Sequence, residues 1–235
     1  MRIAIIETGV PPAPLKERHG DYPTMMAQML APFAPNLSFF AVKAQDGEPL
    51  PPVDAFDGLL ITGSPAGVYE DHDWIGPLEK LVRDTAKAGK PQVGICFGHQ
   101  LMAQAFGGKV EKSDKGWGVG VHKYAVKDRA EWMAPESNRI ACAVSHQDQV
   151  VEAPKGARVL AGSDFCPLGA LSYAEGPAIS FQMHPEFEHD YATDLLRFRA
   201  ERFGKTLVDE GLQTLAGESD RTMMARWIAN FFQGA

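Results

Sequence analysis

The chain has 235 residues, of which 45% are hydrophobic and 23% charged, and its net charge is −7. This composition is typical of a folded globular protein, and the length allows a full core without disulfides or metals. The acidic excess argues against a nucleic-acid binder, which would need a basic face. The apolar runs are too short to span a membrane, so no membrane partner is expected.

The cysteine content and the N-terminus bear on the cellular compartment. Three dispersed cysteines, Cys96, Cys142 and Cys166, form neither a disulfide framework nor a zinc site. The N-terminal sequence MRIAIIETG has no secretory-type spacer or cleavage site. We therefore expect a cytoplasmic protein with no metal and no cofactor.

Short apolar runs alternate with amphipathic stretches across the first hundred residues. Strands are predicted at Arg2–Glu7, Leu37–Val42, Gly58–Thr62 and Gln92–Ile95. Helices are predicted at Tyr22–Ala34, capped by Asp21, at Trp74–Ala88, ended by Gly89, and at Gln100–Phe106. Pro11–Pro14 and Pro49–Pro52 are expected to be surface connections. This alternation predicts an α/β fold with a doubly wound, mainly parallel sheet flanked by helices.

The second half contains strand-like segments separated by turn residues, which predict hairpins and returns to the main sheet. These segments are Gly118–Val126, Ile140–Ser145, Ala157–Ala161, Leu168–Tyr173 and Ala178–Gln182. Helices are expected at Tyr191–Phe203 and Asp220–Phe232, with Gly204 and Gly211–Glu218 as loops between them. We expect a single domain over residues 1–235, with a core at 1–190 and a helical C-terminal extension at 191–235.

Cys96 lies in Gly94-Ile-Cys96-Phe-Gly98, between a short apolar strand and a helix. A nucleophile held on such a strand–turn–helix elbow needs small residues on both sides. The N-terminus of the following helix favours the thiolate, which is the reactive form. A buried structural cysteine is the alternative, and it is the interpretation given to Cys142 and Cys166.

His184 and Glu186 follow the last predicted strand in the segment Met183-His184-Pro185-Glu186. Proline biases the residue before it toward extended backbone, in which residues two apart face the same way. The carboxylate could then orient the imidazole of a base. A surface turn is the alternative. His99 is expected to pack or to bond the backbone, and Ser145 to Asp148 to form a substrate-side loop.

The third predicted strand ends in Thr62-Gly63-Ser64-Pro65. Parallel sheets bind ligands at the carboxyl ends of their strands. Backbone N–H groups of this turn and of Phe97 could therefore stabilise a tetrahedral oxyanion. An ordinary Gly/Ser/Pro turn is again the alternative.

Together these segments resemble the class I, or triad, glutamine amidotransferases, which have a flavodoxin-like fold. GICFGHQ at 94–100 is similar to that family's cysteine elbow, HPEF at 184–187 to its HPE motif, and ITGSP at 61–65 to its oxyanion strand. SHQDQV at 145–150 resembles a loop of the GMP synthetase branch. The resemblance covers roughly residues 1–190.

The resemblance implies a role for each matching residue. Cys96 would be the nucleophile, His184 the general base and acid, and Glu186 its orienter, with the amides of Ser64 and Phe97 as the oxyanion hole. The substrate-binding residues implied are Gly63, Gln100, Gly116, Trp117, Ser145 and His146. The family's usual turn is G-G-P, so Ser64 departs from the pattern and makes the pocket narrower or more polar.

The predicted function is cysteine-dependent hydrolysis of the γ-amide of glutamine through a γ-glutamyl thioester, with release of ammonia. A separate synthase subunit could accept that ammonia, because no synthase domain or P-loop is seen in the chain. The GSP turn and the helical tail resemble the stand-alone branch, so a γ-glutamyl peptidase acting on glutathione-like compounds is an alternative. A non-catalytic binding module is another. An intracellular-protease-like enzyme is disfavoured because Phe97, not His, follows Cys96.

Overall fold

The computed structural model describes residues 1–234 and contains a nine-stranded mixed sheet in the order β2-β1-β3-β4-β11-β10-β9-β6-β7. The strands of this sheet are β1 (Arg2–Glu7), β2 (Ser38–Lys43), β3 (Gly58–Ile61), β4 (Gln92–Ile95), β6 (Gly118–Val126), β7 (Arg139–His146), β9 (Arg158–Gly162), β10 (Ala170–Ser172) and β11 (Ala178–Phe181). From β2 to β11 all neighbours pair parallel, and beyond β11 they pair antiparallel. The parallel order 2-1-3-4-11 is that of flavodoxin-like folds, so the predicted fold class is confirmed.

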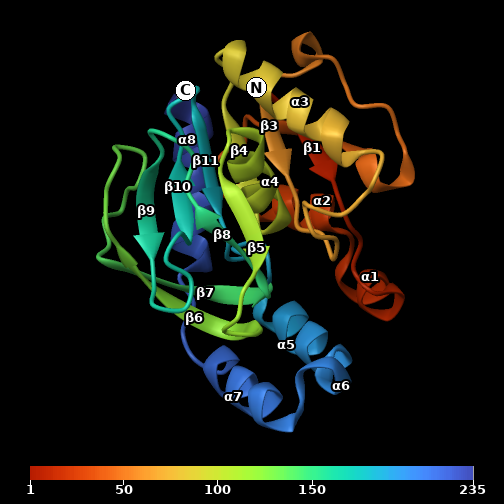
Figure 1. Ribbon diagram of the computed structural model, residues 1–235, viewed down its shortest axis with the longest axis vertical. Helices are drawn as coiled ribbons and strands as arrows, with labels where there is room; N and C mark the ends of the chain where they lie inside the picture. Colours follow the sequence, from red (N-terminus) through yellow and green to blue (C-terminus); the bar gives the residue numbers. More distant parts are fainter. Residues whose placement is uncertain (235) are drawn as a thin grey trace.

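Helices cover both faces of the sheet (Figure 1). They are α1 (Ala13–His19), α2 (Tyr22–Leu30), α3 (Ile75–Lys87), α4 (Phe97–Ala105), α5 (His189–Phe198), α6 (Ala200–Phe203), α7 (Lys205–Leu215) and α8 (Arg221–Gly234). Successive residues of a strand point to opposite faces. Ile3 and Ile5 of β1 therefore pack with α2 and α8, whereas Ala4 and Ile6 pack with α3 and α4.

The predicted hairpin region is the antiparallel half of the sheet, built around the long β6–β7 pair. A separate two-stranded sheet pairs β5 (Lys109–Lys112) with β8 (Asp148–Glu152). Helices α5 and α7 pack against β6 through a third apolar cluster. In Figure 1 both termini lie at one end of the molecule and α5, α6 and α7 lie at the other.

Some expected boundaries and loops are wrong. Pro11–Pro14 is not a connection throughout, because α1 begins at Ala13 with Pro14 in its first turn, where a missing N–H costs nothing. The helix after Cys96 begins at Phe97, three residues earlier than expected. The loop predicted at Gly211–Glu218 is helical as far as Leu215, because Gly211 lets α7 approach Gly120 of β6 closely.

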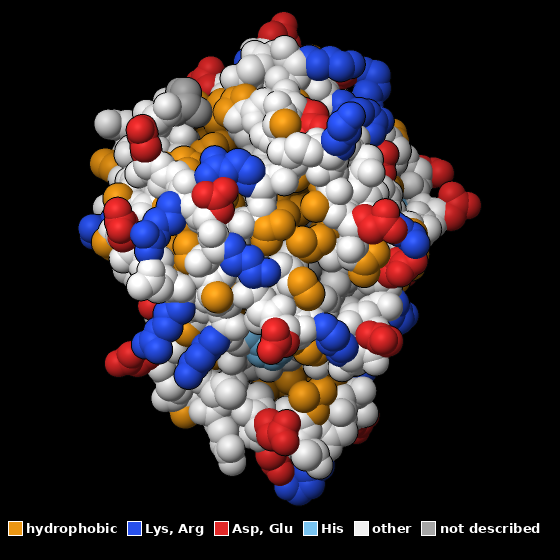
Figure 2. Space-filling view, turned by 60° about the vertical axis from the view of Figure 1, so that its left-hand side comes forward, with side chains coloured by type: hydrophobic (Ala, Val, Ile, Leu, Met, Phe, Trp, Pro, Cys, Tyr) orange, Lys and Arg blue, Asp and Glu red, His pale blue; other side chains and the backbone are white. Residues whose placement is uncertain are grey.

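The polar segment from Ser145 to Asp148 is also not a loop throughout, because Ser145 and His146 end β7 and Asp148 begins β8. On the face drawn in Figure 2, basic and acidic side chains are interspersed. No helix within residues 1–234 is long and apolar enough to cross a membrane.

Candidate active site

Cys96 occupies the sharp turn between β4 and α4. Its backbone has φ 52° and ψ −100°, and it is the only non-glycine residue with positive φ in the described part of the chain. Its N–H donates to the carbonyl of Phe181 on β11 at 2.8 Å. A strained residue held in place by its neighbours is typical of a functional position.

Two glycines make this turn possible. A Cβ at Gly94 would collide with the carbonyl of Gly98, and a Cβ at Gly98 would lie 2.5 Å from the carbonyl oxygen of Ile61. The N–H of Gly98 donates to the carbonyl of Thr62 at 3.2 Å. The first turn of α4 is therefore pressed directly against the end of β3.

His184 and Glu186 form a buried pair. Glu186 Oε1 lies 2.7 Å from His184 Nδ1, and the two side chains are 5% and 0% exposed. The ring of Phe187 stacks on the imidazole with 4.0 Å between centroids. Burial acts to lower the pKa of His184, but the charges of Glu186 and Cys96 outweigh it and raise that pKa to about 10.

The turn at Gly63 brings Cys96 and His184 together. A Cβ at Gly63 would lie 3.0 Å from His184 Cε1 and 3.6 Å from Cys96 Cβ. The charge of Cys96 is one of the causes that raise the pKa of His184. Because Nδ1 is bonded to Glu186, Nε2 is the nitrogen that remains for the sulfur.

The two predicted oxyanion donors come from neighbouring strand ends. Within residues 1–234, neither the N–H of Ser64 nor that of Phe97 donates a hydrogen bond. The Ser64 hydroxyl accepts the N–H of Ala66 at 3.1 Å, so it is turned back onto its own loop. Thr8, directly after β1, donates its N–H to Thr62 Oγ1 and its hydroxyl to the carbonyl of Thr62, both at 3.0 Å.

Gln100 lies behind the nucleophile and is almost fully buried. Its Nε2 donates to the carbonyl of Asp148 at 2.8 Å and to Gln182 Oε1 at 3.1 Å. Gln182 Nε2 in turn lies 3.6 Å from Cys96 Sγ. The sulfur thus has a hydrogen-bond donor that comes from the residue directly after β11.

Two small cavities meet at Cys96. The larger has a volume of about 100 Å³ and is lined by Gln100, Trp117, Ser145 and His146 as well as Cys96. The smaller is about 20 Å³ and is lined by Gly63, Ser64, Cys96, Ser145 and His184. Gly116 lines neither of them.

The two remaining histidines near the elbow are neutral. His146 Nδ1 lies 3.1 Å from the carbonyl of Asp148, and burial lowers its pKa to about 3. His99 Nδ1 lies 2.7 Å from Ser180 Oγ, and burial lowers its pKa to about 3 as well. The expectation that His99 packs rather than acts as the base agrees with this full burial.

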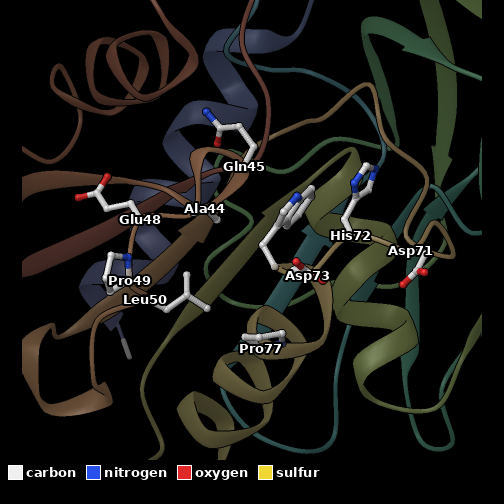
Figure 3. Close-up of a pocket in the computed structure, with 11 residues that line it drawn as sticks. Ala44, Gln45, Glu48, Pro49, Leu50, Asp71, His72, Asp73 and Pro77 are labelled. Atoms are coloured by element: carbon white, nitrogen blue, oxygen red, sulfur yellow. The ribbon is translucent and has the colours of Figure 1, made fainter.

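A separate cavity of about 620 Å³, larger than the two at Cys96, contains none of the predicted site residues. Figure 3 shows it between Gln45, Glu48 and Leu50 on one side and His72, Asp73 and Pro77 on the other. Trp74 belongs to its lining and packs on Phe97 with 5.3 Å between centroids. Of the residues that the structure describes, no three His, Cys, Asp or Glu side chains are grouped to hold a metal ion.

Sequence reasoning missed three residues of this site. Gln182 lies two residues before His184 of the HPE motif, and its place directly after β11 was the available signal. Arg199 and Arg202 line the larger cavity, and Arg199 also lines the smaller one. They come from the helical tail, which carries no motif, so only the folded chain brings them to Cys96.

The doubly wound α/β fold thus places a cysteine on an elbow at the carboxyl edge of its sheet, with a buried His–Glu pair beside it, which is an arrangement suited to nucleophilic catalysis. The family profile described as "Glutamine amidotransferase class-I" matches residues 19–200. The chain therefore belongs to the class-I glutamine amidotransferase family.

Two relatives fit this assignment, and a solved structure shares the fold. The chain is 28% identical over 193 residues to "Gamma-glutamyl peptidase 3" of Arabidopsis thaliana, covering 77% of this chain and 76% of that protein. It is 34% identical over 142 residues to a glutamine-hydrolysing GMP synthase subunit of Archaeoglobus fulgidus, covering 60% and 73%. A glutamine amidotransferase from Thermotoga maritima matches with a TM-score of 0.81 over 99% and 98% of the two chains; at 19% identity it supports the fold alone.

Proposed function

We propose that this protein hydrolyses the γ-amide bond of glutamine or of a γ-glutamyl compound through a γ-glutamyl thioester on Cys96. The observation that carries the proposal is the buried His184–Glu186 pair, 2.7 Å apart, beside a cysteine held at φ 52° on an elbow. A buried carboxylate that orients an imidazole toward a nucleophile is the general arrangement of such catalysis. A binding module would not need this combination.

Acylation starts from the Cys96 thiolate paired with protonated His184. The sulfur attacks the γ-carbonyl carbon, and the oxygen becomes an oxyanion that accepts hydrogen bonds from the N–H groups of Ser64 and Phe97. His184 then passes its Nε2 proton to the nitrogen, the C–N bond breaks, and ammonia or an amine leaves. Glu186 keeps the imidazole in the required tautomer throughout.

Deacylation uses the same groups in reverse. Neutral His184 takes a proton from water, and the hydroxide attacks the thioester carbon within the same oxyanion hole. Collapse of the tetrahedral intermediate breaks the C–S bond, which releases glutamate and restores the thiolate. Gln182 Nε2, 3.6 Å from Cys96 Sγ, stabilises the sulfur anion in both half-reactions.

The mechanism is the same for two leaving groups, ammonia and an amino acid or peptide. If ammonia leaves, the protein is a glutaminase, and a separate synthase subunit is a possible acceptor, as the similarity to glutamine-hydrolysing GMP synthase subunits suggests. If an amino acid or peptide leaves, it is a γ-glutamyl peptidase. Arg199 and Arg202 line the larger cavity and have no ion-pair partner within residues 1–234, which favours the γ-glutamyl peptidase. A cytoplasmic location fits the three free cysteines of either enzyme.

The test is glutamate release by the purified protein from L-glutamine and from glutathione, each assayed with wild type, Cys96→Ala and Cys142→Ala. Cys142 is a matched control because it is a buried free thiol on β7 outside both cavities. We expect Cys96→Ala to abolish turnover and Cys142→Ala to retain it. Equal turnover by wild type and Cys96→Ala would contradict the proposal.

A further inference from the structure

Three cationic side chains line the larger of the two cavities at Cys96, although the chain as a whole is acidic. Arg199, Arg202 and Lys112 have no carboxylate within ion-pair distance among the residues described. The two carboxylates of the lining are already engaged, Asp148 with the hydroxyl of Tyr69 at 2.9 Å and Glu70 with His72 at 3.1 Å. The lining therefore has an excess of positive charge available to a ligand.

The chain holds two of these cations in defined positions. Arg199 stands where the backbone breaks between α5 and α6, and its Nη1 donates to Ser145 Oγ at 3.1 Å. The guanidinium of Arg202 stacks over the ring of Trp117 at 4.3 Å. Ser145 and Trp117, both predicted from sequence to bind substrate, thus each contact an arginine of the helical tail.

The candidate substrates differ in the number of carboxylates that they carry. Glutamine carries one carboxylate and one ammonium group, whereas a γ-glutamyl amino acid carries a second carboxylate on the leaving side. Arg199 is the only one of the three cations that also lines the smaller cavity with His184, the group that protonates the departing nitrogen. Arg202 and Lys112 are confined to the larger cavity, on the side of Gln100.

We propose that Arg199 is a specificity-determining residue that binds the carboxylate of an amino-acid leaving group, so that the substrate is a γ-glutamyl amino acid or peptide. This inference rests on the proposed function of the same site. A guanidinium with a free N–H edge is suited to a carboxylate, and the bond is charge-assisted. Such a bond contributes roughly a 10- to 100-fold preference.

The test compares γ-glutamylglycine with its C-terminal amide, which differ only in the leaving-side carboxylate. Wild type should prefer the acid in kcat/KM. Arg199→Ala should lose about 10- to 100-fold on the acid, mainly through a higher KM, and change little on the amide. Arg199→Lys should recover part of the preference for the acid. If circular dichroism shows that Arg199→Ala is unfolded, Arg199→Lys takes its place in the comparison. Arg197→Ala, on the exposed side of α5, is the matched control and should leave both substrates unchanged.

Equal use of acid and amide by wild type, or an equal loss on both substrates in the Arg199 variants, would overturn the role of Arg199. Either result would leave the proposed hydrolysis intact, because both substrates would still be cleaved by wild type and not by Cys96→Ala. Failure of wild type on both compounds and on glutamine would instead contradict the proposed function itself.

Discussion

At the scale of single residues, the carboxylate of Glu186 contacts His184 Nδ1 and raises the pKa of the imidazole. The pair is buried, so neither charge is screened by solvent. Glu186→Gln should keep the shape of the site but remove the negative charge and allow the wrong tautomer of His184. We expect kcat to fall by roughly 10²- to 10⁴-fold with a smaller change in KM. Steady-state glutamate release measures this.

Glu188→Gln is the control for that variant, because Glu188 lies two residues further on but is 70% exposed and paired with Arg221. It should retain nearly full activity. A Glu186→Gln enzyme as active as Glu188→Gln would show that the buried carboxylate has no part in turnover.

The same pair predicts how stability depends on pH. The pKa of His184 is about 10 in the folded protein, above its ordinary value of 6.5. A group whose pKa rises on folding contributes stability that is fully present below the unfolded value and is lost as pH rises through the folded value. The stability advantage of wild type over Glu186→Gln should therefore be largest near pH 6.5 and shrink toward pH 10. Urea unfolding across this range measures it, and an advantage that grows with pH would contradict the assignment.

The placement of the three residues proposed as a triad could be predicted from sequence, because each lies in a short segment whose local geometry depends on its neighbours in the chain. Cys96 follows a strand and is flanked by glycines that the packing requires. His184 and Glu186 are two residues apart and do meet. Arg199 could not be predicted, since it is 103 positions from Cys96 along the chain and carries no local pattern.

At the scale of elements, the elbow depends on contact between α4 and β3. Gly98→Ala would place a methyl group 2.5 Å from the carbonyl oxygen of Ile61, and backbone on both sides prevents relief. We expect Gly98→Ala to lower the free energy of unfolding, measured in urea, by about 1–3 kcal/mol. Gly76→Ala in α3 is the matched control, since nothing lies within 4 Å of its Cβ position; it should be neutral or stabilising by up to about 1 kcal/mol. Equal stability of the two variants would contradict the close packing at the elbow.

Elements were predicted well where hydrophobic periodicity was strong and poorly where tertiary contacts decide. The five parallel strands match their expected positions to within a residue at each end. Helix α1 was missed because its prolines suggested a connection, although they occupy positions where helices accept proline. Strands β5 and β8 were missed because each becomes a strand only by pairing with the other.

At the scale of the whole molecule, the helical tail is joined to the rest of the protein at two places. Helix α8 contributes Met224, Trp227 and Phe232 to the same apolar cluster as Ile3 of β1 and Ile95 of β4. Helices α5 and α7 form another cluster with β6. The organisation as one domain stays a prediction, and these contacts favour it over an independent C-terminal segment.

Trp227 provides a test of that organisation. Its side chain is fully buried, and its Nε1 donates to the carbonyl of Pro135 at 2.9 Å. Trp227→Ala should lower the free energy of unfolding of the whole chain by about 3–5 kcal/mol, with one transition by fluorescence and circular dichroism. Arg226 is the exposed neighbour, and its guanidinium lies over the ring of Phe33 at 5.1 Å. Arg226→Ala should lower the free energy of unfolding by at most about 1 kcal/mol. Two separate transitions would contradict a single folding unit.

The proposed hydrolysis requires that Cys96 carries a γ-glutamyl group during turnover. The most direct measurement is rapid acid quenching during turnover of a γ-glutamyl substrate, followed by peptide mapping by mass spectrometry. We expect one γ-glutamyl group attached to the peptide that contains Cys96, formed fast enough to explain the rate of glutamate release and absent from Cys96→Ala. Turnover without this adduct, or an adduct confined to Cys142 or Cys166, would contradict it.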